Sequence, residues 1–224
     1  MRTADTLREI YKTLLSAYGP QEWWPAETPF EVCIGAILTQ NTAWTNVKKA
    51  IDNLKSAGVF EPDSLLGLEP AELAALIRPA GYFNQKARKI KDFLLWFRQT
   101  GGFEAMEAME TDALRKSLLS VRGIGPETAD SILLYALGRP VFVVDTYTIR
   151  VLARHDIIDH DADYGRVQSL FHENLPHDTL MFNEFHALFV QLGKTRCKRT
   201  GPLCLNCPLE KLPGYPPVAR EFPS

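Results

Sequence analysis

Helical periodicity with regular breakers is the feature that most constrains the fold of this chain. Apolar residues recur at three- and four-residue spacing in segments that breakers such as Pro62 and Gly101-Gly102 separate. The only β-like run, Val141–Val144, is too short and isolated to imply a sheet. About ten helices without a sheet predict an all-α fold. The predicted helices cover residues 3–18, 30–40, 42–57, 71–78, 84–99, 111–120, 126–137, 145–155, 163–174 and 182–193.

The length and composition are those of an ordinary globular protein. With 224 residues the chain can form one domain or two small ones with a real core. No apolar run reaches the ~18 residues of a membrane span, and the N-terminus lacks the pattern of a signal peptide. We therefore expect a cytoplasmic protein without membrane contact. The prolines after Cys207 predict a tail without regular structure; they are Pro208, Pro213, Pro216, Pro217 and Pro223.

The charge balance gives no global field for nucleic acid. The formal net charge is −2, so nucleic-acid binding must rest on local patches. Two basic patches stand out, and the alternative for each is a solvated helix face or loop. They comprise Lys86, Arg88, Lys89 and Lys91, and Lys194, Arg196, Lys198 and Arg199.

A glycine-bounded turn between two amphipathic segments is the first candidate binding feature. Gly123-Ile124-Gly125 follows one predicted helix, and Pro126 suits the first turn of the next, where its missing N–H is not needed. The glycines allow positive φ and the close approach of another chain. The amides at the start of the second helix can then hold an anion such as a DNA phosphate. An ordinary helix–turn–helix corner is the alternative for this pattern alone.

Asp145 is the first candidate catalytic residue. It follows the apolar run Val141–Val144 and begins a predicted helix, so its structural role would be an N-cap. Capping and catalysis can coexist in one carboxylate. A fixed carboxylate in largely apolar surroundings can stabilise positive charge or orient and deprotonate water.

The stretch VRGIGPETAD at 121–130, followed by VVDTYTIRVL at 143–152, resembles the hairpin and catalytic segment of the endonuclease III superfamily of DNA glycosylases. The family pattern is L-P-G-[VI]-G-x-x-T-A and then V-D-T-x-x-x-R. Arg122 replaces the proline, while both glycines, Thr128 and Ala129 stay in register. The resemblance extends from about Trp23 to Cys207.

The resemblance implies a two-lobed, all-α helix-hairpin-helix glycosylase fold. One lobe would be a helical barrel of residues 28–137, with the hairpin at about 112–137. Residues 1–27 and 138–224 would form the second lobe, with a C-terminal cysteine-cluster loop at 197–213. The residues implied to contact DNA are Arg122, Gly123, Gly125, Thr128, Lys194 and Arg196.

The resemblance makes Asp145 the essential acid. Members that also cut the strand carry a lysine two residues after the second hairpin glycine, which attacks the sugar and forms a Schiff base. Glu127 stands at that position, and a carboxylate cannot do this chemistry. We therefore predict a monofunctional glycosylase that uses water.

Aromatic residues near the N-terminus indicate the base pocket. Trp23, Trp24 and Pro25, the run L-T-Q-N-T, then Trp44 and the string RPAGYFNQKARKI resemble the endonuclease III-type 3-methyladenine DNA glycosylases. For any single tryptophan, a place in the core is the alternative. The resemblance implies that a flipped base stacks between aromatic faces. The implied pocket residues are Trp24, Pro25 and Trp44, with Gln40 or Asn41 near the wedge that fills the duplex.

The cysteines suggest a metal centre. Cys33 lies in an apolar run and is expected to be a buried small hydrophobe. Cys197, Cys204 and Cys207 match the first three positions of the family's C-x6-C-x2-C-x5-C loop for a [4Fe–4S] cluster, but Pro213 occupies the fourth. We expect a cluster whose fourth iron takes water or another side chain, or a [3Fe–4S] cluster. The alternatives are an empty loop or zinc.

The sequence thus predicts a monomeric glycosylase that excises alkylated purines, with 3-methyladenine as the expected lesion, from double-stranded DNA in base excision repair. A positively charged base would be attracted by aromatic faces through cation–π contacts of ~0.5–2 kcal/mol each. The alternatives are an endonuclease III-like glycosylase/AP lyase for oxidised or mismatched bases, and a non-catalytic helix-hairpin-helix protein that only binds DNA.

Overall fold

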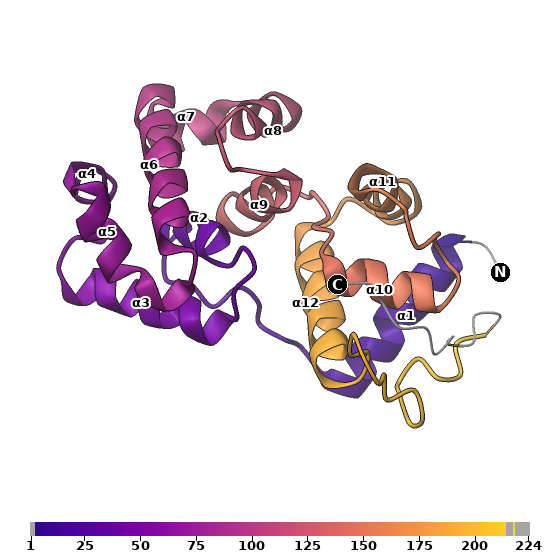
Figure 1. Ribbon diagram of the computed structural model, residues 1–224. Helices are drawn as coiled ribbons and strands as arrows, with labels where there is room; N and C mark the ends of the chain where they lie inside the picture. Colours follow the sequence, from indigo (N-terminus) through magenta and orange to yellow (C-terminus); the bar gives the residue numbers. More distant parts are fainter. Residues whose placement is uncertain (1–2, 214–216, 218–224) are drawn as a thin grey trace. The chain divides into compact units, whose positions relative to one another are not determined.

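The computed structural model describes residues 3–213 and residue 217 (Figure 1). Within these residues the chain is helical and contains no β-strand, which confirms the predicted all-α class. It divides into two compact units, Ala26–Arg139 and Met1–Pro25 with Pro140–Ser224, and each is described by itself. None of the helices in the described part of the chain is long and apolar enough to cross a membrane.

The unit Ala26–Arg139 is built around α2, which is buried along almost its whole length. α2 begins at Pro29 behind the N-cap Thr28, whose side chain accepts a hydrogen bond from Glu31 N. It packs against α3, α6, α9 and η2, and α6 lies between α2 and the pair α4 and α5 (Figure 1). The elements are α2 (Pro29–Leu38), α3 (Trp44–Ser56), α4 (Pro62–Gly67), α5 (Pro70–Leu76), η1 (Arg78–Ala80), α6 (Phe83–Thr100), α7 (Gly102–Ala108), α8 (Thr111–Leu119), α9 (Pro126–Ser131) and η2 (Ile132–Ala136).

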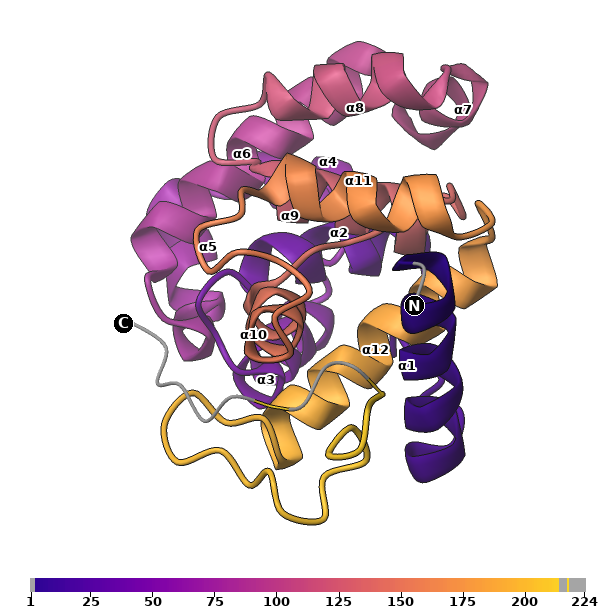
Figure 2. The ribbon, with the colours of Figure 1, turned by 90° about the vertical axis from the view of Figure 1, so that its right-hand side faces the viewer.

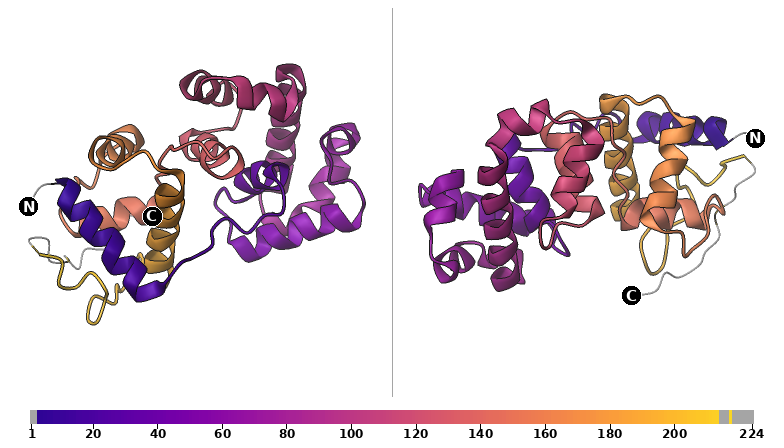
Figure 3. Two further views of the ribbon diagram at one scale, coloured as in Figure 1. Left: turned by 180° about the vertical axis from the view of Figure 1, so that it is seen from behind. Right: turned by 90° about the horizontal axis from the view of Figure 1, so that it is seen from above.

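The other unit packs four helices around a phenylalanine cluster. They are α1 (Thr3–Tyr18), α10 (Thr146–Arg154), α11 (Tyr164–Asn174) and α12 (Thr179–Thr195). α12 lies against both α1 and α10, and α1 also contacts α11 (Figures 2 and 3). Phe142 stacks on Phe171 with ring centroids 3.6 Å apart, and Phe185 meets both edge-on. The Val141–Val144 run is therefore buried extended chain that leads into α10.

All ten predicted segments contain helix, but some details differ from expectation. The short helices α4 and α7 and the 3-10 helix η1 were not predicted, because Pro62, Gly102 and Pro79 interrupt the apolar periodicity. Pro62 and Gly102 are each the first residue of a short helix, and Pro79 lies within η1. The second half of the predicted helix 126–137 is a π-helix, η2. In the proline-rich tail, residues 208–213 form turns without regular structure, as predicted, and the remainder except Pro217 lies outside the described residues.

Candidate functional site

The turn between α8 and α9 has the predicted hairpin form, and its two glycines play different parts. Gly123 has φ +86°, and a Cβ there would lie 2.5 Å from Lys89 Cγ, so both positive φ and a close approach require glycine. Gly125 is the N-cap of α9 with an ordinary extended backbone (φ −93°, ψ 178°), and a Cβ there would meet nothing within 4 Å. Positive φ is therefore found at Gly123 and not at Gly125, which leaves open space at the start of α9.

Gln40 ties the hairpin to the L-T-Q-N-T loop. Its Nε2 donates to Gly123 O at 3.1 Å and to Thr128 Oγ1 at 2.9 Å, and its Oε1 accepts a hydrogen bond from Lys89 Nζ. Gln40 was predicted near the DNA wedge, and Thr128 at the DNA. The structure directs the Gln40 amide to the hairpin and buries Thr128 beneath it.

Lys86 joins the L-T-Q-N-T loop to the turn that follows η1. Its Nζ donates to Leu38 O at 2.7 Å, to Thr42 Oγ1 at 2.5 Å and to Ala80 O at 2.8 Å. The ammonium is buried, which lowers the pKa of Lys86 to about 8, and the charge of Lys89 adds to this effect. Lys86 and Lys89 together thus hold three loops on one face of the unit Ala26–Arg139.

Three of the four side chains of the first basic patch are hydrogen-bonded within the unit. Lys86 is buried, the half-buried Lys89 donates to Gln40, and the half-buried Lys91 donates to the carbonyls of Leu66 and Leu68. Arg88 is the member that remains exposed. Lysines interleaved with apolar residues can pack their stems within the protein and hydrogen-bond to its loops. Sequence alone does not distinguish such lysines from a patch that faces DNA.

The outward-facing groups of these three loops form what we call the loop face: Asn41, Tyr82, Arg122, Gly123 and Glu127. All of these residues are exposed, and Asn41 and Tyr82 have positive φ values of 53° and 45°. Tyr82 is 65% exposed. Tyr82 was not among the predicted site residues, although an aromatic residue directly after a glycine turn, in RPAGYFN, was a usable signal.

Asp145 caps α10, as predicted, and its carboxylate is buried. Oδ1 accepts hydrogen bonds from Thr148 N at 2.7 Å and from Thr148 Oγ1 at 2.9 Å. Oδ2 lies 3.5 Å from His186 Nε2, an ion-pair distance rather than a short hydrogen bond. Burial alone would raise the pKa of Asp145, but the neighbouring His186 and the bonds from Thr148 outweigh it and lower the pKa below its ordinary value. His186 was not predicted, because it lies far from Asp145 in the sequence and has no motif around it.

Lys194 lies in the same unit and within charge range of Asp145. Loss of hydration lowers the pKa of Lys194, and the negative charge of Asp145 acts in the opposite direction. The ammonium lies 5.3 Å from the ring centroid of Trp23, a cation–π distance. The rings of Trp23 and Trp24 meet edge-on at 5.8 Å.

The predicted pocket residues are divided between the two units. Trp24 is half-buried and Pro25 exposed in the unit that holds Asp145, whereas Trp44 is the half-buried first residue of α3 in the other unit, which also holds Gln40 and Asn41. A shared pocket for these residues stays a prediction.

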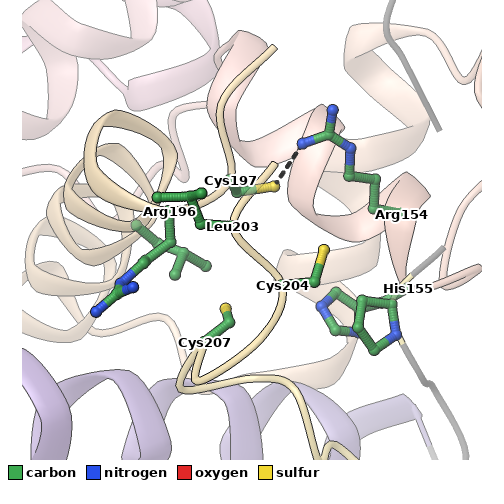
Figure 4. Close-up of a pocket in the computed structure, with 9 residues that line it drawn as sticks. Arg154, His155, Arg196, Cys197, Leu203, Cys204 and Cys207 are labelled. Atoms are coloured by element: carbon green, nitrogen blue, oxygen red, sulfur yellow. Dashed lines mark hydrogen bonds between the residues drawn. The ribbon is translucent and has the colours of Figure 1, made fainter. Parts of the chain in front are cut away.

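The cysteine loop is anchored to α10 by two arginines. Arg150 Nε donates to Cys197 O at 2.7 Å, and Arg154 Nη1 donates to Cys197 Sγ at 3.2 Å and to Lys198 O at 2.7 Å. Arg150 is the arginine of the V-D-T-x-x-x-R pattern, so that motif residue has a structural role here. Cys197, Cys204 and Cys207 line one pocket beside Arg154 and His155 (Figure 4). The predicted DNA-contacting Arg196 is partly exposed and lines this pocket too.

Cys33, in contrast, is fully buried within α2, and burial raises the pKa of its thiol. This confirms the expectation that it is a small core residue.

Comparison with known proteins identifies the family. Residues 34–177, more than half of the chain, match the model of the HhH-GPD superfamily base excision DNA repair protein. The chain belongs to the HhH-GPD superfamily. A protein of Methanocaldococcus jannaschii that has been assigned as a DNA repair glycosylase is 46% identical over 210 residues, or 92% of this chain and 95% of that protein. Endonuclease III of Thermotoga maritima is 28% identical over 183 residues, or 80% of this chain and 79% of the relative.

Solved HhH-GPD structures have the same fold. The 3-methyladenine DNA glycosylase of H. pylori, bound to 1,N6-ethenoadenine, has a TM-score of 0.74 and 29% identity, covering 87% of this chain and 98% of that one. A trapped endonuclease III–DNA covalent intermediate has a TM-score of 0.80 at 23% identity, covering 95% and 96% of the two chains, a likeness that shows the fold. These comparisons confirm the endonuclease III-like glycosylase fold. The chain is a DNA glycosylase of base excision repair, and its partner is DNA.

Proposed function

We propose that this glycosylase is monofunctional and excises alkylated purines, 3-methyladenine above all, from double-stranded DNA. The observation that carries the proposal is the pairing of a buried, ionised Asp145 with a glutamate, Glu127, at the position of the family's lyase lysine. Such a chain supplies a fixed negative charge but no amine at that position.

Asp145 would act mainly through its charge. Cleavage of the N-glycosidic bond builds positive charge on the sugar, and a carboxylate that is already fixed needs no reorganisation to stabilise it. Thr148 holds Oδ1 with two hydrogen bonds, so Oδ2, on the side of His186, is the oxygen with remaining capacity to orient the attacking water.

The aromatic residues support an alkylated purine as the lesion. N3-methyladenine carries positive charge, which makes it a good leaving group and attracts it to electron-rich rings. Trp24, Pro25 and Trp44 would supply the walls, and a neutral adenine would stack more weakly between them. The likeness to the H. pylori 3-methyladenine DNA glycosylase at 29% identity supports this substrate class.

The loop face would bind the DNA backbone. The open approach at Gly125 leaves the amides at the start of α9 accessible to a phosphate, and Arg122 adds a positive charge beside them. Lys194 and Arg196 would contribute from the other unit.

The cysteine loop would hold a [4Fe–4S] cluster as a structural cofactor. Three cysteines line one pocket, and a hydrogen bond from Arg154 to Cys197 Sγ suits a thiolate ligand. Among residues 3–213 and 217, no three His, Cys, Asp or Glu side chains are arranged to hold a single metal ion. These residues therefore give no support to a zinc site, in which all the ligands bind one ion. In an iron–sulfur cluster, by contrast, each ligand binds a different iron, and the ligands surround the cluster at a wider spacing.

A panel of duplexes tests the function. Each duplex carries one lesion, either 3-methyladenine, another alkylated purine, an oxidised pyrimidine or a mismatched base, and release of the free base is measured. We expect release of 3-methyladenine well above the others. Release confined to oxidised or mismatched bases would assign a different substrate class, and DNA binding without release of any base would leave only a binding protein.

Borohydride trapping tests the absence of lyase activity. We expect no covalent adduct with the wild-type chain, whereas Glu127→Lys places an amine at the family position and serves as the gain-of-function control. Any adduct with the wild-type chain would contradict the monofunctional assignment, and its loss in Lys194→Ala would identify Lys194 as the lyase nucleophile.

A further inference from the structure

The pocket in the cysteine loop has four side chains that can bind iron. Three are Cys197, Cys204 and Cys207, and the fourth is His155. Figure 4 labels Cys204 and His155 among the side chains that line this pocket. Pro213, which stands where the family pattern has its fourth cysteine, has no side-chain donor atom and does not line the pocket.

His155 is held in place by the end of α10. It is the C-cap of that helix, its backbone N–H donates to Val151 O and Leu152 O, and only 4% of the residue is exposed. A buried histidine at a fixed helix end has little rotamer freedom, which is what a metal ligand needs.

The same helix end fastens the cysteine loop. Arg154, the residue before His155, donates to Cys197 Sγ, to Lys198 O and, at 2.9 Å, to Arg199 O. Arg150, one turn earlier, holds Cys197 O. Arg150 and Arg154, one turn apart on α10, therefore point their side chains at the loop, and both fix the first cysteine of the motif. His155, the C-cap that follows Arg154, lines the same pocket.

We propose that His155 is the fourth protein ligand of a [4Fe–4S] cluster whose other ligands are Cys197, Cys204 and Cys207. The inference rests on the proposed cluster and specifies how this chain compensates for the missing cysteine. A neutral imidazole in place of a thiolate makes the cluster one charge less negative, and histidine ligation raises the reduction potential of iron–sulfur centres.

The test is anaerobic reconstitution of the full chain with iron and sulfide, followed by iron, sulfide and zinc analysis and EPR. Four variants are compared: wild type, His155→Ala, His155→Cys, and His160→Ala as a control at an exposed histidine of the same unit. We expect four irons per chain in the wild type and in the control. His155→Ala should lose one iron and show the EPR signal of an oxidised three-iron cluster. His155→Cys should restore four irons and lower the reduction potential.

Pulsed EPR of protein labelled with 15N-histidine gives a readout that does not depend on the fold of a variant. Coupling of a histidine nitrogen to the reduced cluster is expected in the wild type and absent in His155→Cys. Four irons in the wild type without such coupling, or an unchanged cluster in His155→Ala, would show that His155 is not a ligand, while the proposed cluster would stand. A wild type that binds zinc or no metal would overturn the cluster and the ligand together. A three-iron cluster in the wild type would overturn the ligand while keeping iron–sulfur chemistry.

Discussion

The loop face of one unit and the surroundings of Asp145 in the other differ in whether the functional groups are exposed or buried. On the loop face the groups proposed to meet DNA are exposed, and the buried Lys86 and the half-buried Lys89 and Gln40 hold the loops that carry them. At Asp145 the functional group itself is buried, with Oδ1 held by hydrogen bonds from Thr148 and Oδ2 at ion-pair distance from His186. The contrast follows from the two proposed functions, because binding DNA requires accessible groups on a rigid support. Stabilising a transient charge requires a carboxylate that does not move.

The largest effect should come from neutralising the buried acid. Asp145→Asn keeps an oxygen that can accept the Thr148 bonds, so the cap of α10 survives while the charge is lost. We expect excision to fall on the order of 10³-fold. Single-turnover base release measures this loss, and fluorescence anisotropy with an uncleaved duplex should show unchanged binding. An equal loss of binding would mean that Asp145 supports the fold rather than the reaction.

The two hairpin glycines provide a matched pair on the loop face. Gly123→Ala places a side chain at φ +86° against Lys89, so the free energy of unfolding should fall by about 1–2 kcal/mol and DNA binding with it. Gly125→Ala meets no atom of the chain, so the unfolding free energy should be unchanged, while the added methyl group hinders an approaching phosphate. Thermal denaturation and anisotropy separate the two. Equal denaturation midpoints for the two variants would contradict the close approach at Gly123.

A change at His186 should shift the pH dependence rather than abolish activity. His186 helps to lower the pKa of Asp145, so His186→Gln should raise that pKa and move the acid limb of excision to higher pH. The stabilising contribution of Asp145 is present above its unfolded pKa of about 3.9 and is lost as the pH falls through the lower folded value. The variant should therefore also unfold at a higher pH on acidification. His177→Gln, at an exposed histidine of the same unit, is the control. An identical acid limb in both variants would show that His186 does not lower the pKa of Asp145.

The smallest effect should come from Gln40, whose side chain is hydrogen-bonded to the hairpin. Gln40→Ala removes the bonds to Gly123 O and Thr128 Oγ1, and the loosened hairpin should bind duplex roughly 3- to 10-fold more weakly, a loss of ~1 kcal/mol. Binding is compared with Gln85→Ala, an exposed residue of α6. If Gln40→Ala lowers base release while binding is unchanged, Gln40 acts at the base rather than through the hairpin.

Local patterns in the sequence were enough for most of the helices, for the hairpin and for the cap at Asp145. Each depends on spacing within a few residues, as at Gly123 and Pro126. Residues whose role depends on distant partners could not be assigned. Lys86 and Lys89 look like a basic surface until their acceptors, Leu38 O and Gln40, are known. Likewise, no local sequence feature indicates the role of His186, because its contact with Asp145 depends on the packing of α12 on α10.

The central claim is that this chain releases an alkylated base with water and leaves the strand intact. One measurement tests it directly: a duplex with a single 3-methyladenine is incubated with the wild-type enzyme, and free base and strand breaks are quantified in the same sample. We predict stoichiometric base release and a full-length abasic strand that breaks only after alkali. Failure to release the base, or strand cleavage that keeps pace with release before alkali is added, would contradict the account.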